Sequence, residues 1–241
     1  LKAQVDFADV NLSLIRNFPN LSVHIDKLSV VGVEPFEGDT LAYIDDLFLT
    51  LDIMSVIRGS EIQIKKIKLD KPIINILVLP DGTANYDITI DDEEDASANE
   101  ESESDVKLDI KEYQISNGSF VYNDATLPMV LSLQGLNHTG KGNFAEEVFT
   151  LYTQTKIDQT IVDYDGIRYL KNARATLDAD IAMDLKNWKF EFMENELNVN
   201  QLVLGFEGWL AMPEDDIDMD FKFATKKSDL KTILSIIPAE F

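Results

Sequence analysis

The sequence predicts a mainly β protein: a curved, bulged antiparallel sheet that forms an open groove or half-barrel, with two short helices. Two observations support this prediction. An eight-residue pattern recurs along the chain, in which a pair of polar residues separates two apolar-any-apolar triplets. Between such segments lie short turns rich in Gly, Asn and Asp, which is typical of an antiparallel meander.

The recurring pattern predicts strands that bend. Alternation with period two indicates a strand with one buried face and one wet face. The polar pair breaks this phase, so both triplets can share a face only if the strand accommodates an extra residue, as a β-bulge does. A bulge bends and twists its strand, so the sheet should be curved. Full or looser copies begin at Val23, Ala42, Ile62, Leu108, Leu131 and Leu197.

The apolar positions of the pattern are expected on one face. This face is either the floor of an open groove, where it can take lipid, or one side of a closed core; the sequence leaves both open. The candidates are Val23, Ile25, Leu28, Val30, Ile62, Ile64, Ile67, Leu69, Leu108, Ile110, Leu197, Val199, Leu202 and Leu204.

The first 90 residues are expected to form one β module. Strands are predicted at 5–15, 23–33, 42–51 and 61–79, the last with Pro72 at a kink or edge. A short helix is predicted at 53–58, because the spacing is helical and Gly59 suits the left-handed position that follows a helix.

Residues 91–105 separate this module from the rest of the chain. The segment holds nine acidic and no basic residues, and no large apolar side chain. Such a composition cannot bury enough surface to order itself, so we expect an acidic flexible linker or loop.

Residues 106–241 are expected to continue the β repeats. Ser228 can cap a final short helix whose apolar residues form one stripe, and Pro238 ends it. The predicted strands span 107–122, 129–136, 147–157, 173–185, 188–193, 197–210 and 217–223.

Composition excludes several classes of protein. The chain has 241 residues, 45% of them apolar, and carries 21 basic against 44 acidic residues, a net charge of −23. Nucleic acid is therefore not an expected partner, because phosphate binding needs clustered Lys and Arg. No cysteine is present and no apolar run approaches the roughly 20 residues of a membrane-spanning helix. Because the chain opens at Leu1 without Met, we interpret it as a fragment whose anchor segment was cut away.

Candidate chemistry is sparse. Asp216, Asp218 and Asp220 match the first positions of a calcium loop, but the required Gly and the final Glu are missing. These residues alternate with apolar ones, so a strand with an acidic outer face explains them. His24 and His138 lie in separate strands, at positions that can face solvent, without the spacing of a zinc motif. We therefore expect no catalytic residue, no metal and no cofactor, and hence no enzyme.

Long stretches of the chain resemble the AsmA family. Residues 18–32 (FPNLSVHIDKLSVVG) and 38–88 (beginning GDTLAYIDDLFLTLD) are similar to the amino-terminal module of that family. Residues 108–124 (LDIKEYQISNGSFVYND) resemble its recurring strand, and 228–241 resemble a short helix between strands. Tyr86 stands where many members have Trp.

The resemblance implies a periplasmic protein of Gram-negative bacteria, anchored to the inner membrane by a helix missing from this fragment. It also implies a role, shared with TamB-like and bridge-like lipid transfer proteins, in phospholipid transport between inner and outer membrane and in outer-membrane biogenesis. The implied partners are phospholipid acyl chains and an outer-membrane or periplasmic protein. The alternative is a structural or assembly factor that pairs with partner proteins through exposed β edges.

Overall fold

The computed structural model describes residues 2–14, 18–58, 62–89, 106–212 and 217–227. The expected acidic linker at 91–105 and the expected helix at 228–237 lie outside these ranges. Within them, one sheet of 13 strands accounts for almost the whole chain, and the predicted short helix is present. The elements are β1 (Ala3–Asp6), β2 (Asp9–Ser13), β3 (Asn20–Gly32), β4 (Thr40–Asp52), α1 (Ile53–Arg58), β5 (Ile62–Asp70), β6 (Ile73–Val78), β7 (Val106–Asp124), β8 (Met129–Lys141), β9 (Val148–Tyr164), β10 (Ile167–Asp184), β11 (Lys189–Val199), β12 (Leu202–Ala211) and β13 (Asp218–Lys227).

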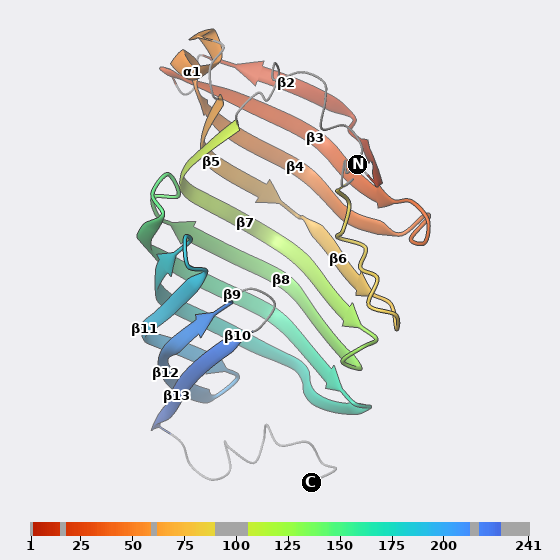
Figure 1. Cartoon of the computed structure of the whole chain (residues 1–241), viewed down its shortest axis with the longest axis vertical. Helices are drawn as coiled ribbons and strands as arrows, with labels where there is room; N and C mark the ends of the chain where they lie inside the picture. Colours follow the sequence, from red (N-terminus) through yellow and green to blue (C-terminus); the bar gives the residue numbers. More distant parts are fainter. Residues whose placement is uncertain (1, 15–17, 59–61, 90–105, 213–216, 228–241) are drawn as a thin grey trace.

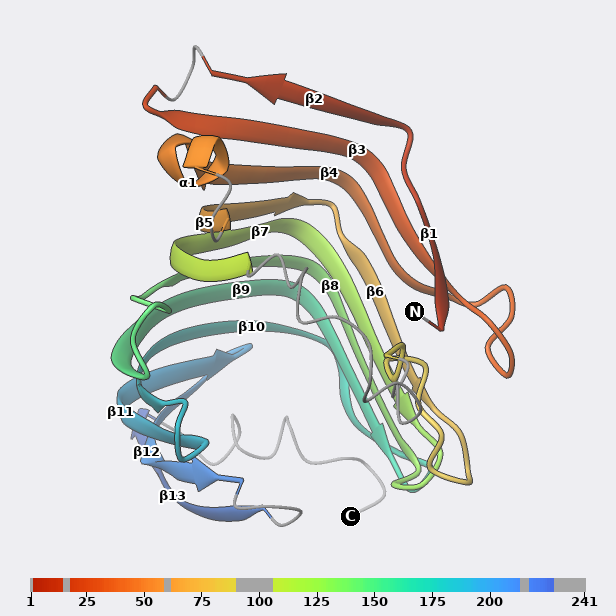
Figure 2. The same ribbon diagram turned by 45° about the horizontal axis from the view of Figure 1, so that its top comes forward.

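The predicted mainly β fold and its curvature are confirmed. Figures 1 and 2 show the strands side by side in one layer that curves around a hollow and does not close on itself. The described part of β1 and β2 lies at one edge of the sheet, and β13 lies at the other. The described elements therefore form an open groove.

The expected purely antiparallel pairing is wrong at the centre of the sheet. β7 runs parallel to β5, from Ile62 opposite Val106 to Asp70 opposite Ser116. It then continues parallel to β6, while the other strand pairs are antiparallel. The segments before and after the acidic linker thus contribute neighbouring strands to one sheet.

Several predicted strands have different limits. The strand expected at 61–79 is divided into β5 and β6, because Lys71 adopts a positive φ of 46° and Pro72 has no N–H to continue the ladder. The strand expected at 197–210 is a hairpin of β11 and β12 with a two-residue turn at 200–201. Asn200, at φ 53°, tolerates the left-handed conformation that this turn needs.

The long strands bend together along one line, which we call the crease. A residue with positive φ interrupts each of five segments there: Lys27, Lys71, Asn117, Gly135 and Asn172, at φ values between 46° and 64°. The register aligns the first three, because Asp26, Asp46, Asp70 and Ser116 form one cross-strand row directly beside Lys27, Lys71 and Asn117. Figure 2 shows β3 to β10 turning at this level. The crease makes each strand concave along its length.

Candidate functional site

The register assigns the apolar side chains of nine strands to one face. Cross-strand partners project on the same side of a sheet, so a row of directly paired residues marks one face. One such row crosses the sheet from β3 to β12 and consists of Ile25, Leu47, Leu69, Ile115, His138, Thr155, Leu177, Leu197 and Leu204. We call the face that carries this row the floor. Seven of the nine members are aliphatic.

The floor continues across the crease. A Cβ built on Gly118 would lie 3.0 Å from the Ile115 side chain, so both residues project on the same side despite being three apart. Asn117 between them, at φ 50°, breaks the alternation. Beyond the crease the same face carries Phe120, paired with Ile74 and Leu133. The phase break at Asn117 thus keeps the apolar side chains before and after the crease on the same face.

A second phase break is a true bulge. Lys66 is opposite Thr50, and Ile64 is opposite the adjacent Leu51, so Lys65 is an extra residue in β5. This is the bulge that the doubled lysine predicts. It keeps Ile64 and Ile67 on the floor and leaves both lysines on the other face.

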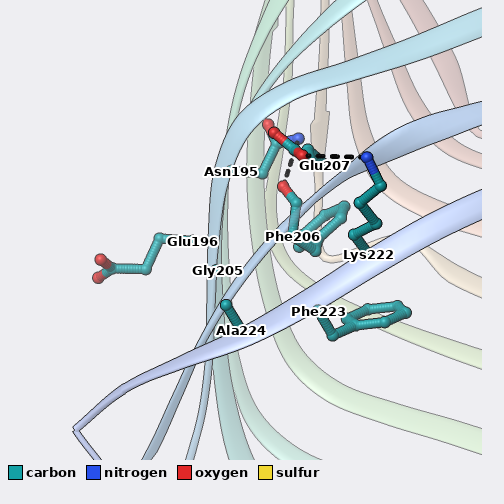
Figure 3. Close-up of a pocket in the computed structure, with 8 residues that line it drawn as sticks. All are labelled: Asn195, Glu196, Gly205, Phe206, Glu207, Lys222, Phe223 and Ala224. Atoms are coloured by element: carbon teal, nitrogen blue, oxygen red, sulfur yellow. Dashed lines mark hydrogen bonds and ion pairs between the residues drawn. The ribbon is translucent and has the colours of Figure 1, made fainter.

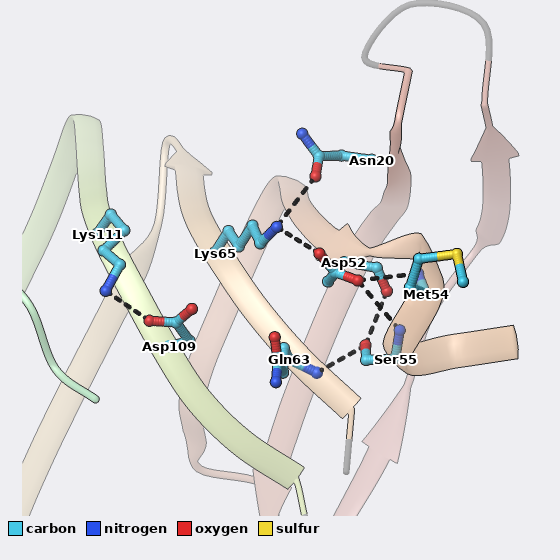
Figure 4. Close-up of polar contacts among 8 residues, drawn as sticks. All are labelled: Asn20, Asp52, Met54, Ser55, Gln63, Lys65, Asp109 and Lys111. Carbon is cyan, nitrogen blue, oxygen red and sulfur yellow. Dashed lines mark hydrogen bonds and ion pairs between the residues drawn. The ribbon is translucent and has the colours of Figure 1, made fainter. Parts of the chain in front are cut away.

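The bulge is fixed by polar contacts at the end of β4 (Figure 4). Lys65 forms an ion pair with Asp52, which lowers the pKa of that carboxyl, and contacts the Asn20 side chain. Asp52 also accepts the backbone N–H of Ser55 at the start of α1. The Ser55 hydroxyl in turn accepts the backbone N–H of Gln63 in β5. The helix thereby ties β4 to β5.

The opposite face is polar and strongly acidic. Beside the crease it carries the cross-strand row of Asp9, Asp26, Asp46 and Asp70. Like charges in this arrangement repel, and the row has polar and charged partners: the His24 ring contacts Asp46 at 2.6 Å, and the Lys71 ammonium contacts Asp45 at 3.1 Å. Asp45, followed by Asp70, raises the pKa of Lys71.

The floor is open within the described residues. On this face Val10 and Leu12 of β2 and Phe223 of β13 are more than a third exposed, and no large side chain of the described part of the chain is fully buried. Exposure is high where the floor reaches the sheet edges, with Leu12 of β2 at 66% and Phe223 of β13 at 63%. A packed core of this size would instead enclose many such residues. Among the described elements α1 is the only helix, and it packs mainly against β4 and β5.

Aromatic rings gather on the floor near the β13 edge. The ring centroids of Phe206 lie 5.9 Å from both Phe192 and Phe223, and 6.3 Å from Phe221. Figure 3 shows Phe206 and Phe223 on the concave side of the strands and Glu196 on the opposite side. A cavity of about 590 Å³ is lined by these two rings together with residues of the opposite phase, among them Glu196, Glu207 and Lys222. The floor is therefore the concave face.

A polar trio lies in the middle of the floor. The His138 ring is 3.0 Å from the Tyr113 hydroxyl through Nε2 and 2.8 Å from the Thr155 hydroxyl through Nδ1. Burial lowers the pKa of His138 and raises the pKa of Tyr113, so both groups stay neutral near pH 7. Sequence reasoning placed His138 at a position that can face solvent. Gly135, at φ 64°, shifts the phase of β8 and brings the imidazole onto the floor instead.

The structure places the predicted apolar residues as follows. Val23, Ile25, Ile64, Ile67 and Leu69 lie on the floor by register, as do Leu197, Val199, Leu202 and Leu204 around the β11–β12 turn. Leu28 and Val30 lie beyond the crease and are half-buried. Ile110 is buried where β7 bulges opposite Lys65. For Ile62 and Leu108 only the backbone is described: Ile62 pairs with Val106, and Leu108 pairs with Ile64.

The described residues do not gather three His, Asp or Glu side chains into a metal-binding group. The acidic motif at Asp218 and Asp220 is the start of β13, where both residues pair across to β12 on its outer face. Asp216 lies outside the described ranges. Nor does any helix in those ranges have the length and apolar content needed to cross a membrane.

A sequence model of the AsmA family matches residues 8–202, which is most of the chain. The protein therefore belongs to the AsmA family, as the motifs around the repeated strands indicated. Membership in this envelope-associated family indicates a role in outer-membrane assembly or lipid transport. No curated protein and no solved structure shows significant similarity to the chain.

Proposed function

We propose that this chain is a non-enzymatic periplasmic groove that carries phospholipids between the inner and outer membranes, held at the inner membrane by an anchor outside this sequence. The observation that carries the proposal is the continuous apolar floor, which runs across the crease and reaches both edges of the described sheet. Each acyl methylene that leaves water for such a surface gains about 0.8 kcal/mol. A chain of a dozen or more methylenes is thus held without any specific contact.

The polar outer face supports the same function. Charged residues such as Lys68 and Glu207 keep the convex side wet, while the concave side offers only aliphatic and aromatic surface over most of its length. An amphipathic layer of this kind stays soluble and still presents a nonpolar path. The open edges allow the path to continue into neighbouring segments or partners.

The test is native mass spectrometry of the purified protein after incubation with bacterial phospholipid vesicles. We expect mass additions that match intact phospholipids and that disappear when the floor is made polar. Absence of bound phospholipid at every lipid concentration would contradict the proposal.

A second candidate is an assembly factor that pairs with another protein through an edge strand. Among the described strands, β13 pairs only with β12, and β2 only with β3, so each leaves one backbone edge for a partner strand. Ile217, Met219 and Phe223 are exposed at the β13 edge. Proline substitution of Lys222, on the outer face of β13, would disfavour β augmentation and leave the apolar side chains of the floor in place. Lost partner binding with retained lipid binding would favour this second function.

A further inference from the structure

We infer that Tyr113, His138 and Thr155 form a polar contact point in the floor that hydrogen-bonds an acceptor oxygen of a bound phospholipid, either an ester carbonyl or a phosphodiester oxygen. This inference rests on the proposed function. It adds a position along the groove at which the polar part of the lipid is held. The trio would fix the position of the lipid along a mostly apolar surface.

The trio lies at the centre of an apolar row. In the row from Ile25 to Leu204, the two polar members are His138 and Thr155, which are neighbours on β8 and β9. Tyr113 is in the adjacent row, opposite Gly140. Polar groups at the centre of an apolar surface are costly unless they are hydrogen-bonded. The hydrogen bonds of His138 to Tyr113 and to Thr155 offset this cost.

The trio has one more hydrogen-bond donor than its internal bonds use. A neutral imidazole has one N–H, and the two hydroxyls add two O–H groups, giving three donors. The bonds from His138 to Tyr113 and to Thr155 use two of them. In either tautomer one hydroxyl is left to donate to an oxygen outside the trio. Phospholipid ester and phosphodiester oxygens are acceptors, so they match this donor.

The backbone beside Tyr113 leaves room for its ring. A Cβ on Gly140 would lie 2.3 Å from the Tyr113 ring, so the ring lies directly over this glycine. Phe144 contacts the same ring edge to face, with centroids 6.0 Å apart. Gly140 therefore acts as a positioning residue for the Tyr113 hydroxyl.

The experiment compares three ligands on the folded chain. Diphenylhexatriene, a fluorescent hydrocarbon without oxygen, reports apolar binding directly. A diacyl phosphatidylethanolamine and its dialkyl ether analogue, which lacks ester carbonyls, are measured by displacing it. The test variant is Tyr113→Phe with Thr155→Val, which removes both hydroxyls and keeps the side-chain shapes. The matched control is Tyr152→Phe with Thr139→Val, on the same region of β8 and β9 but on the outer face.

We expect the test variant to bind the diacyl phospholipid about three- to tenfold more weakly, the loss typical of one neutral hydrogen bond. Binding of diphenylhexatriene should stay unchanged, and so should both affinities of the control. If the ether analogue loses affinity equally, the contacted oxygen belongs to the phosphodiester; if it does not, the oxygen is an ester carbonyl. Gly140→Ala, with the trio intact, should reproduce the loss by displacing Tyr113.

Two outcomes would overturn the inference. One is an unchanged phospholipid affinity in the test variant, and the other is an equal loss for the hydrocarbon, which would indicate a structural role. Failure of the proposed function gives a different result, because the unaltered protein would then bind neither diphenylhexatriene nor phospholipid. Melting temperatures of all variants identify any that do not fold.

Discussion

Ile64→Glu places a carboxylate on the floor and separates an open groove from a sealed core. Ile64 is half-buried beside the Lys65 bulge and pairs with Leu51. Full burial of an isoleucine stabilises a protein by about 1.5–3 kcal/mol, so a half-buried one contributes about 1–2 kcal/mol. In an open groove the carboxylate keeps much of its water and avoids the larger cost of a buried charge. Against a typical unfolding free energy of about 5–15 kcal/mol, the variant should stay folded.

The effect on lipid binding should be larger than the effect on folding. A hydrated carboxylate on the floor excludes about four methylenes of an acyl chain from contact. At about 0.8 kcal/mol each, this removes about 3 kcal/mol of binding free energy. Because 1.4 kcal/mol corresponds to a factor of ten, lipid affinity should fall about 100- to 200-fold.

Two control variants isolate the role of the floor. Ile64→Leu preserves the apolar surface and should change stability by less than about 1.5 kcal/mol, with lipid affinity unaltered. Lys68→Glu lies on the same strand but on the outer face, and its side chain is exposed. Lys68→Glu changes the net charge by two units, from positive to negative, whereas Ile64→Glu changes it by one. Any general repulsion of anionic lipid would therefore be stronger in this control than in the floor variant.

Urea unfolding followed by circular dichroism gives the stabilities, and titration with a fluorescent phospholipid gives the affinities. A folded Ile64→Glu protein that binds lipid normally would refute the assignment of Ile64 to the lipid path and shift weight to pairing through the sheet edges. Global unfolding of the same variant would indicate that this face is sealed rather than open.

Three further predictions concern the fold. Asn172→Val should lower the unfolding free energy by about 1–2 kcal/mol in urea titrations, because a β-branched residue resists the φ of 53° at the crease. Asn172→Gly should not lower it. Equal unfolding free energies of the two variants would contradict the role of the left-handed residue at the crease. Deletion of Lys65 should remove the bulge and leave Ile64 opposite Leu51 on the floor, so the protein should still fold in urea titrations; deletion of Lys68, in the regular part of β5, should turn the residues before it to the other face and cost several kcal/mol or abolish folding. A Lys65 deletion that does not fold would contradict the assignment of Lys65 as the extra residue. The Asp124 carboxylate accepts hydrogen bonds from the Thr126 and Tyr122 hydroxyls, which lowers its pKa to about 2. The folded-state pKa is below the unfolded value, so this stabilisation is present above about pH 4 and is lost as pH falls towards 2; the stability difference between the protein and Asp124→Asn should shrink over that interval, and a constant difference would contradict it.

The sequence predicts where the strands break their alternation better than it predicts which structure forms at each break. The same polar pair produces a crease at Asp26–Lys27, a bulge at Lys65 and a hairpin turn at Asn200. At the crease β3 has no extra residue relative to β4 and therefore no bulge. β4 carries its own polar pair, Asp45–Asp46, at the same level. Whether a phase break becomes a bulge therefore depends on the partner strand, which the local pattern does not identify.

The pairing of β5 with β7 and the polar trio could not be predicted, because both depend on strand neighbours that are distant in the sequence. The parallel alignment of β5 with β7 joins residues more than 40 positions apart across an acidic segment, and no local signal specifies it. His138 reaches the floor only because Gly135 changes the phase of β8. The Asp165–Gly166 turn between β9 and β10 was a missed signal, since this dipeptide favours a two-residue hairpin turn.

The crease explains why the phase breaks at Lys27, Lys71 and Asn117 lie at matching levels in neighbouring strands. A strand that bends alone would lose its hydrogen bonds to straight neighbours, so a bend can persist only if adjacent strands turn at the same level. If one strand lacked the phase break, its apolar residues beyond the crease would project to the outer face, and the floor would be interrupted there. The left-handed residues at Lys27, Lys71, Asn117 and Asn172 cost free energy individually. Together they allow one apolar surface to follow a sheet that is curved both along and across its strands, which is the geometry that a continuous path for acyl chains requires.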